Sequence, residues 1–344
     1  MGCAQATGRL LQARAGGPWF EERKKALMSI SNVAKLGNQA GVAPRRRSGF
    51  RRRQELEGLL CILPWLIGFI CFKFGPMVAS LVIGMMRWDA LQPPRWVGLD
   101  NFQTMLSDLR WYNALYNTAY LSFLSVPAQL TVAFLFALML NEKLRGMPTF
   151  RTIFYLPSQT PLVATAFLWN WIYHPDFGLA NALLSTVGLP TQNWLFDLQL
   201  AKPSLILITL WSGIGVPMII FLAGLQGVPD SLYEAASLDG AGAFARFRHV
   251  TIPMLSPVIF FNLIIGIIAS FQGFFTIVFL TTGGGPVYAT LIYVVYIYFR
   301  AFQDFKMGYA AALAWVLFLI IMVMTAIQFL LARRWVYYEG SERT

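Results

Sequence analysis

The stretch EAASLDGAGAFARF, residues 234–247, lies between two long apolar segments and holds two acids, a run of small residues and one arginine. Gly240 and Gly242 interrupt it, and glycine readily adopts the left-handed backbone conformation that ends a helix. The spacing therefore predicts a short helix before Gly240 and a second one after Gly242. Small side chains at the turn let another surface approach closely, and Glu234 and Asp239 can form hydrogen bonds to it.

The first of these two short helices has its own start signal. Ser231 followed three residues later by Glu234 predicts a capping box, and the acid just before them suits a helix start. We expect this helix to run from about residue 232 to residue 238, and the second to carry residues 244–248. Pro253 then opens the next apolar segment, at a position where proline costs little.

The apolar segments on either side of this stretch dominate the chain. Of the 344 residues, 57% are hydrophobic and 12% are charged, whereas a soluble protein carries about 25% charge. Too little polar surface remains to cover a water-soluble globule, so a membrane protein is the leading class. Cys3, Cys61 and Cys71 show no metal-ligand spacing, and we interpret them as small apolar residues.

Six apolar stretches are long enough to cross a bilayer, which takes roughly 20 residues each. No apolar segment precedes Cys3, so we expect no secretory signal; Met28 is an alternative start. The sequence predicts an all-α polytopic membrane protein with six transmembrane helices at about residues 59–86, 114–140, 152–173, 203–227, 253–281 and 308–332.

The basic residues give these spans an orientation. If the N-terminus is inside, the inner segments hold 20 of the 27 Lys and Arg residues and the outer segments hold six. A cluster of six arginines within residues 45–53 directly precedes the first span. Basic residues accumulate on the cytoplasmic side of membrane proteins, so both termini are predicted to be cytoplasmic. The net charge of +11 is then a topology signal, and we expect no nucleic-acid partner.

None of the 16 acids lies within a predicted span, and Lys73 is the one charged residue there. His174 and His249 lie at an outer edge and in an inner loop. An ion-coupled carrier usually needs buried carboxylates or histidines to bind its driving ion. We therefore expect the energy source to lie outside the bilayer, and we interpret Lys73 as snorkelling or facing a polar crevice.

The residues of the opening stretch also carry a resemblance. The pattern Glu234, Ala235, Ala236, Gly240, Ala241 and, after the next hydrophobic residues, Pro253 resembles the EAA loop of ABC importer permeases. In that family the loop is the coupling helix that docks on the ATPase subunit. The resemblance implies that Glu234, Ala235, Ala236, Asp239, Gly240, Ala241 and Pro253 transmit ATP-driven closure to the spans.

Other segments resemble the carbohydrate-uptake permeases of the maltose and glycerol-3-phosphate type. They are LPWLIGFICFKFGPM, VGLDNFQTML, RTIFYLPSQTPLVATAFLWNWIY, FQGFFTIVFLTTGGGP and RRWVYYEG. Together they cover about residues 55–340. One departure is Phe275, where relatives often carry a polar residue.

This resemblance implies the type I ABC importer permease (MetI-like) fold and a domain organisation. We expect a basic, flexible cytoplasmic segment over residues 1–54, a permease domain over 55–340 with its coupling loop at 230–253, and a tail at 341–344. The implied partners are a second permease subunit, two ATP-binding subunits, an extracytoplasmic solute-binding protein and membrane lipid. The implied location is the bacterial inner membrane.

The chain is not expected to be an enzyme. It has no Gly-Lys-Ser/Thr phosphate loop after a strand, no Ser–His–Asp arrangement and no zinc spacing. It therefore binds no cofactor in this interpretation, and ATP and Mg²⁺ belong to the partner ATPase subunit.

Uncharged polar and aromatic residues within the spans are candidates for contact with a substrate. Aromatic rings can pack on sugar C–H faces, and amides can bond to hydroxyls; interface anchoring and helix–helix contact are the competing interpretations. Gln272 is the first choice, because it lies deep in a span. The other candidates are Asn262, Phe271, Asn170 and Trp211, together with Trp169, Trp171, Ser212 and Ser270.

Three alternatives remain open. A secondary transporter would import with an ion gradient, and a membrane scaffold would assemble without any solute flux. A glycerol-3-phosphate or polyol importer would favour basic residues along the path, and Lys73 is the only one within a span. We therefore expect a neutral sugar or oligosaccharide.

Overall fold

The computed structural model describes residue 25, residues 48–142 and residues 144–337. The chain divides into two compact units, Met1–Phe74 and Gly75–Thr344. The described elements of the first unit are the helix α3, Ser48–Phe69, and the π-helical segment η1, Ile70–Phe74, in which Lys73 is exposed. Most of the predicted segment 1–54 lies outside the described residues, and its boundary stays a prediction.

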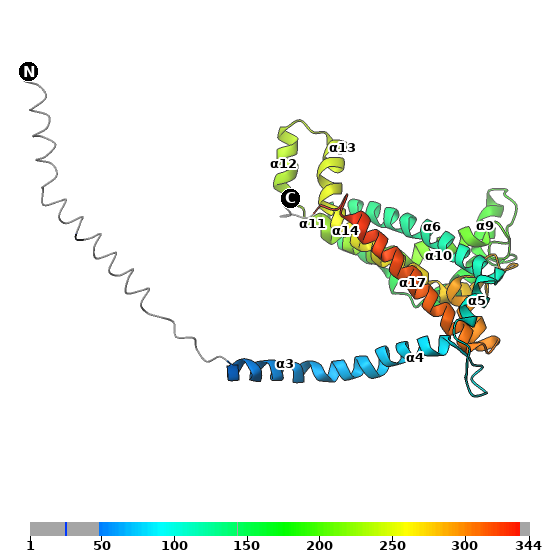
Figure 1. Ribbon diagram of the computed structural model, residues 1–344. Coiled ribbons are helices and arrows are strands. Elements are labelled where there is room, and N and C mark those ends of the chain that lie inside the picture. The colour runs from blue at the N-terminus through cyan, green and yellow to red at the C-terminus, as the bar shows by residue number, and fades with distance from the viewer. Residues whose placement is uncertain (1–24, 26–47, 143, 338–344) are drawn as a thin grey trace, which may run out of the picture. The chain divides into compact units, whose positions relative to one another are not determined.

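The second unit is almost entirely helical (Figure 1). A short antiparallel pair, β1 (Met86–Arg87) and β2 (Arg95–Trp96), places Met86 opposite Trp96. The helical elements in chain order are α4 (Gly75–Gly84), α5 (Asp100–Leu106), α6 (Leu109–Leu140), α7 (Met147–Gln159), α8 (Leu162–Ile172), α9 (Leu179–Thr186), α10 (Ala201–Gly213), α11 (Gly215–Gln226), α12 (Asp230–Leu238), α13 (Ala243–Arg246), η2 (Phe247–Thr251), α14 (Ile252–Gly273), α15 (Phe275–Thr281), α16 (Tyr293–Tyr298), η3 (Phe299–Gln303) and α17 (Met307–Ala332).

The described residues contain four helical segments that are long and apolar enough to cross a membrane. These segments are Glu57–Gly84, Leu109–Leu140, Ala243–Thr281 and Met307–Ala332, and they match predicted spans one, two, five and six. A fifth results if α10 and α11, which meet at 50°, form one span at the place of predicted span four. The helical membrane class is confirmed, and the count of six stays a prediction.

The predicted span at 152–173 is divided in two. Helix α7 ends at Gln159, Thr160 is extended, and α8 begins after Pro161. Proline disfavours helical backbone in the residue before it, which explains the break. The 11-residue α8 is too short to cross about 30 Å of hydrocarbon by itself.

The predicted helix at 244–248 is present as α13 and η2, and it continues directly into span five. Segments α13, η2, α14 and α15 form one 39-residue apolar segment. Pro253 is therefore the second residue of α14 and does not open a new helix after a loop. Proline donates no N–H, and the change from π- to α-helical bonding at this point accommodates it.

The core forms around α6, which packs against α10, α11, α14 and α16. Tyr293 of α16 is fully buried at 0% exposure and links three helices. Its hydroxyl accepts from the Trp111 indole nitrogen at 2.9 Å and donates to the Leu313 carbonyl at 3.0 Å. Buried polar groups are nearly always hydrogen-bonded, so these two hydrogen bonds fix the mutual placement of α6, α16 and α17.

Large apolar side chains project from the outer faces of the long helices. Phe123 of α6 is 51% exposed and Phe329 of α17 is 55% exposed. Such surface is far larger than water-soluble monomers tolerate, and it is what a lipid-facing helix presents.

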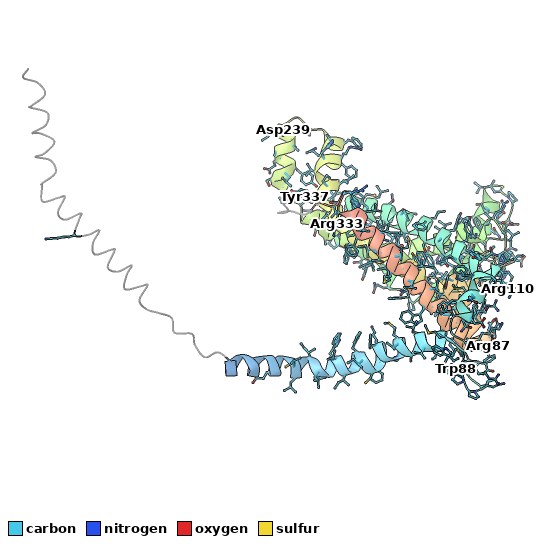
Figure 2. The ribbon with its side chains drawn as sticks, in the orientation of Figure 1. Arg87, Trp88, Arg110, Asp239, Arg333 and Tyr337 are labelled. Carbon is cyan, nitrogen blue, oxygen red and sulfur yellow. The ribbon has the colours of Figure 1, made fainter. Side chains whose placement is uncertain are left out.

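The loops of the second unit gather at two opposite ends. Figure 2 shows Asp239, Arg333 and Tyr337 at one end and Arg87 and Arg110 at the other. Asp239 and Arg333, which come from two different segments predicted to be on the inner side, therefore lie at the same end. Which end faces the cytoplasm stays a prediction.

Candidate functional site

A half-open cavity of ≈320 Å³ lies between α6, α8, α10, α11, α14 and α15. Span four bends by 50° beside it, between α10 and α11, where Gly213 ends the first helix. In span five the single residue Phe274 separates α14 from α15. Broken helices at membrane depth are tolerated where they line a cavity, and they are a common place for a solute to bind.

The cavity is uncharged but not uniformly apolar. Among the described residues that line it, no acid, lysine, arginine or histidine occurs. Its polar side chains are Gln129, Thr209, Ser212, Asn262 and Ser270, and the rest are apolar residues and glycines. Apolar walls with a few hydroxyl and amide groups suit a neutral polar solute, and the volume is within the usual range of roughly 300–1,000 Å³ for small-molecule sites.

The structure brings one of the five principal substrate candidates into this cavity. Asn262 lines it, and its amide nitrogen donates to the Val258 carbonyl at 3.2 Å. Phe271 is 3% exposed and belongs to the apolar core. Gln272 is exposed on another face of α14 and does not line the cavity. Their contact with a substrate stays a prediction.

The other two candidates lie in an aromatic cluster beside the cavity. Asn170 of α8 donates to the Leu280 carbonyl of α15 at 3.0 Å, so it joins two helices. Trp211 packs edge-on against Trp169 with ring centroids 5.9 Å apart. Trp169 in turn lies 5.0 Å from Tyr173. The competing interpretation, helix–helix contact, fits these two residues well.

Gln129 and Thr209 line the cavity and were not among the sequence candidates. Gln129 was detectable from the sequence, because it lies at helical spacing from Thr118, Ser122 and Ser125, which the structure buries on one face of α6.

The helix–turn–helix of the opening stretch exists and protrudes from one end of the unit (Figure 1). Helix α12 begins after Pro229, and no side chain caps its N-terminus. The predicted capping box of Ser231 and Glu234 is therefore wrong. The fixed φ of Pro229, −61°, prepares the helix start instead, and Asp230 supplies the negative charge in the first turn.

Hydrogen bonds hold α12 to the start of span five. The Tyr233 hydroxyl lies 3.1 Å from the Thr251 hydroxyl, and Arg246 donates to the Ser237 hydroxyl at 3.0 Å. These two contacts tie α12 to the first turns of span five.

The turn itself depends on Gly240, whose φ is +80°. The Gly240 N–H donates to the Ser237 carbonyl, and the Ala241 N–H donates to the Ala236 carbonyl at 2.9 Å. These bonds close the C-terminus of α12, as the glycine spacing predicted.

The predicted coupling residues lie around this turn, mostly on its surface. Glu234, Ala235 and Asp239 are exposed, and Ala236, Ala241 and Pro253 are half-buried. Leu238, 90% exposed, and Phe244, 74% exposed, add an apolar tip. An open recess lies between the two helices and is lined by Tyr233, Glu234, Ser237, Leu238 and Arg246. Exposed apolar groups beside acids mark a surface for another protein.

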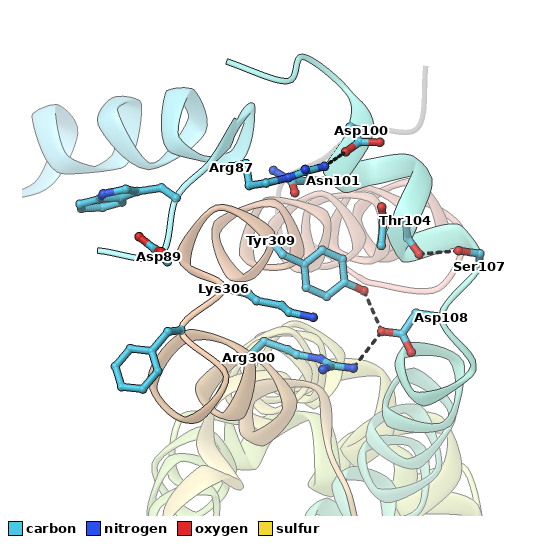
Figure 3. A pocket seen from close by; sticks show the side chains of 12 residues that line it. Arg87, Asp89, Asp100, Asn101, Thr104, Ser107, Asp108, Arg300, Lys306 and Tyr309 are labelled. Carbon is cyan, nitrogen blue, oxygen red and sulfur yellow. Dashed lines mark hydrogen bonds and ion pairs between the residues drawn. The ribbon is translucent and has the colours of Figure 1, made fainter. Parts of the chain in front are cut away.

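A polar pocket of ≈550 Å³ lies at the opposite end of the unit. Figure 3 shows Arg300 and Tyr309 converging on Asp108, the residue that caps α6. Asp108 accepts from the Tyr309 hydroxyl at 2.9 Å, from Arg300 at 3.3 Å and from the Tyr296 hydroxyl. The network ties the start of α6 to α16, η3 and α17.

The hydrogen bonds of this network decide the charge of Asp108. Burial raises the pKa of the carboxyl, but the hydrogen bonds from Tyr296 and Tyr309 and the charge of Arg300 outweigh it. The pKa of Asp108 therefore lies below its ordinary value, and the group is ionised at neutral pH.

A helical bundle with lipid-facing sides, an uncharged cavity beside a bent span and a surface hairpin defines a membrane transport protein. The chain belongs to the family of binding-protein-dependent transport system inner membrane components, whose family model matches residues 109–337. This confirms the permease resemblance and the MetI-like fold.

Individual relatives agree with this family. The chain is 41% identical to the probable ABC transporter permease protein YesP of Bacillus subtilis, over 89% of this chain and 99% of the relative. It is 34% identical to the lactose transport system permease protein LacF of Rhizobium radiobacter, over 85% and 99%. A bacterial alginate ABC transporter, solved in complex with an alginate pentasaccharide-bound periplasmic protein, superimposes with a TM-score of 0.74 at 26% identity. That match covers 84% of this chain and 98% of the other.

Proposed function

We propose that this chain is the transmembrane subunit of an ATP-driven importer for a sugar or oligosaccharide, which an extracytoplasmic solute-binding protein delivers. The main support for a saccharide as the transported solute is the lining of the central cavity. Its hydroxyl and amide groups can bond to sugar hydroxyls, and its apolar walls can pack on sugar C–H faces. The lactose permease and the alginate importer among the relatives support a saccharide cargo.

Helix α12 is the docking element for the ATP-hydrolysing subunit in this proposal. Its exposed acids and apolar tip offer the contact surface, and its bonds to Thr251 and Arg246 carry the motion into span five. ATP and Mg²⁺ are bound by that partner, and this chain binds no cofactor. Two such subunits, a second permease subunit and membrane lipid complete the assembly.

Alternating access follows from this arrangement. Closure of the ATP-bound subunits moves the coupling helices together and turns the cavity outward, where the solute-binding protein releases its cargo. Hydrolysis resets the assembly and opens the cavity inward. The ATP-hydrolysing subunits can shift the bundle between its inward-facing and outward-facing states only by the difference in their affinity for these two states. In this proposal that difference arises at the α12 hairpin, where they bind.

The protein would lie in the bacterial inner membrane with both termini in the cytoplasm. The support is the basic bias of the predicted inner loops, together with the shared end of Asp239 and Arg333. The pocket at Asp108 and Lys306 would then face the solute-binding protein. Lys306 has no ion-pair partner among the residues that the structure describes, so it is available for an acidic group of that protein.

Permeases for glycerol-3-phosphate are also among the relatives, but the central cavity gives this alternative cargo less support. A phosphate dianion is bound by cationic groups or helix N-termini. The described lining of the central cavity holds no cation. An ion-coupled secondary transporter is disfavoured for the parallel reason that this lining offers no carboxylate.

The test is reconstitution of the complete complex in vesicles with a saccharide-binding partner protein. ATP inside the vesicles should drive uptake of a radiolabelled saccharide selected by ligand profiling of that protein, and an ionophore should leave uptake unchanged. Uptake that needs an ion gradient and not ATP would contradict the proposal. Uptake of glycerol-3-phosphate with no saccharide uptake would contradict the cargo class alone.

Contact with the ATPase has its own test. Glu234→Cys should cross-link to the ATP-hydrolysing subunit, and a cysteine at Lys306 should not. The absence of any cross-link from Glu234 would overturn the assignment of α12.

A further inference from the structure

Gln129 of α6 makes a contact that no other polar residue of the central cavity makes. Its amide nitrogen donates to the carbonyl of Gly213, the last residue of α10. Gly213 immediately precedes the 50° bend between α10 and α11. A cavity side chain is thus bonded directly to the backbone at the break of span four.

The other polar side chains of the cavity bond only within their own helices. Thr209 donates to Ile206 and Ser270 donates to Ile267, each three residues earlier. Ser212 and Asn262 likewise donate to carbonyls three or four residues earlier. Among the described polar side chains of the lining, Gln129 is the one that joins two helices.

The contact requires glycine at position 213. A Cβ atom there would lie 2.5 Å from the Gln129 amide nitrogen and 2.9 Å from its amide carbon. Any side chain at 213 would therefore displace the amide from the carbonyl. The glycine and the glutamine act as a pair.

Gln129 retains hydrogen-bonding capacity beyond this contact. A glutamine amide has two N–H donors and an oxygen that accepts two bonds. Only one donor is used among the described residues, and the side chain is half-buried at the cavity wall. A sugar hydroxyl both donates and accepts, so it can bond to the free amide oxygen or compete with Gly213 for the nitrogen.

We propose that Gln129 contacts the cargo and that its amide is shared between the cargo and the Gly213 carbonyl, so that occupation of the cavity changes the bend of span four. This inference rests on the proposed saccharide cargo. It names Gln129 as a residue that contacts the cargo and the bend at Gly213 as the part of the protein that responds to it. Coupling of this kind is reciprocal, so the state of the bend also sets the affinity for cargo.

Transport kinetics give the first test, in the reconstituted complex. Gln129→Leu approximately keeps the size of the side chain and removes both the oxygen and the nitrogen of its amide. We expect the KM for the saccharide to rise about tenfold, the factor that corresponds to about 1.4 kcal/mol. Thr131→Val is the matched control on the same helix, because Thr131 lies outside the cavity and bonds only to Pro127. A wild-type KM in Gln129→Leu would overturn the proposal.

A double-mutant cycle tests the pair without any cargo. Gly213→Ala should lower the melting temperature of the complex modestly in the wild-type background, through loss of the Gln129–Gly213 hydrogen bond, and not in a Gln129→Ala background, where that bond is already absent. Additive effects would show that Gln129 does not hold the bend. The outcome is independent of whether the complex imports a saccharide.

The bend itself can be measured with spin labels at Leu207 and Ile219, which are exposed on α10 and α11. In the complex with its native cysteines replaced, adding saccharide should shift the label distance in the wild type and leave it unshifted in Gln129→Leu. Equal shifts in both, or no shift in the wild type, would overturn the proposal. If the complex transports ions or glycerol-3-phosphate and no saccharide, the proposed function fails while the melting cycle still tests the pair.

Discussion

At the scale of single residues, backbone conformation and buried charge decide where a substitution matters. Gly240 and Gly242 lie two positions apart in the same turn, yet only Gly240 has a positive φ, +80° against −68°. Asp108 and Asp100 lie at the same end of the unit, yet only Asp108 is part of a largely buried network. Each pair offers a variant and its own control.

Gly240→Ala should impair ATP-driven transport, because an L-residue in left-handed conformation costs roughly 1–2 kcal/mol. A Cβ at Gly240 meets nothing within 4 Å, so the backbone alone is responsible. We expect α12 to lose its fixed angle and cargo uptake per ATP hydrolysed to fall several-fold. Gly242→Ala, which also meets open space, should behave like the wild type. Equal defects in both variants would show that the φ of Gly240 is irrelevant.

Asp108→Asn should destabilise the complex by about 2 kcal/mol, because it removes a charge that receives several hydrogen bonds. The pKa of Asp108 is lowered on folding, so its stabilisation is fully present above the ordinary value of 3.8 and is lost as pH falls below it. The difference in melting temperature between wild type and variant should therefore shrink below about pH 4.

The control for that experiment is Asp100→Asn. The Asp100–Arg87 pair is exposed on both sides, at 46% and 73% of the side-chain surface. An exposed ion pair contributes about 0–1 kcal/mol, so the melting temperature should hardly change. A constant gap between wild type and Asp108→Asn down to pH 3 would contradict the charge assignment.

At the scale of elements, interruptions of the spans matter more than their length. Thr160 and Pro161 divide α7 from α8, and Gly213 and Ile214 divide α10 from α11. At the second break the start of α11 packs tightly on α7. A Cβ at Gly215 would lie 2.5 Å from the Ser158 hydroxyl and 3.1 Å from the Tyr155 Cα atom. Side-chain rearrangement can relieve the first contact but not the second.

Gly215→Val should therefore separate α11 from α7 and destabilise the complex by about 1–3 kcal/mol, the usual cost of overpacking. The measurement is the melting temperature in detergent, with Gly273→Ala as the control. A Cβ at Gly273 meets nothing within 4 Å, so its melting temperature should stay at the wild-type value. A stable Gly215→Val complex would mean that α11 is free to move away from α7.

At the scale of the whole molecule, the second unit presents two chemically different ends joined by a lipid-facing middle. One end carries the α12 hairpin and Arg333, and the other carries the pocket around Asp108 (Figures 1 and 2). The cavity lies between them, within the spans. A transporter driven from one side and loaded from the other requires this polarity.

Cysteine labelling in intact cells tests the orientation. A cysteine at Asp239 or at Arg333 should react with a membrane-impermeant maleimide only after the inner membrane is permeabilised. A cysteine at Arg95, in β2 at the opposite end, should react once the reagent reaches the outer face. Labelling of Asp239→Cys from outside would invert the topology and would also contradict docking of an ATPase on α12.

The sequence by itself determined the class of protein and the approximate place of four of the spans. Apolar runs of more than 20 residues, with acids and most basic residues excluded, have no stable alternative to membrane helices. Gly240 likewise predicted the turn after α12 from local backbone preference alone. The start of α12 was harder to predict from the sequence. Pro229 and the Ser231–Glu234 capping box are both typical of a helix start, and in the structure the helix begins after Pro229 without a capping side chain.

Only the tertiary structure decided which polar residues face the cavity. Gln272 and Gln129 are both amides in mainly apolar spans, and an amide by itself does not show whether its face of the helix borders a cavity. Packing of α6 against the bend of span four places Gln129 at the cavity, while α14 exposes Gln272 elsewhere. Such a choice depends on contacts between residues 84 positions apart, as with Gln129 and Gly213, and no local pattern encodes it.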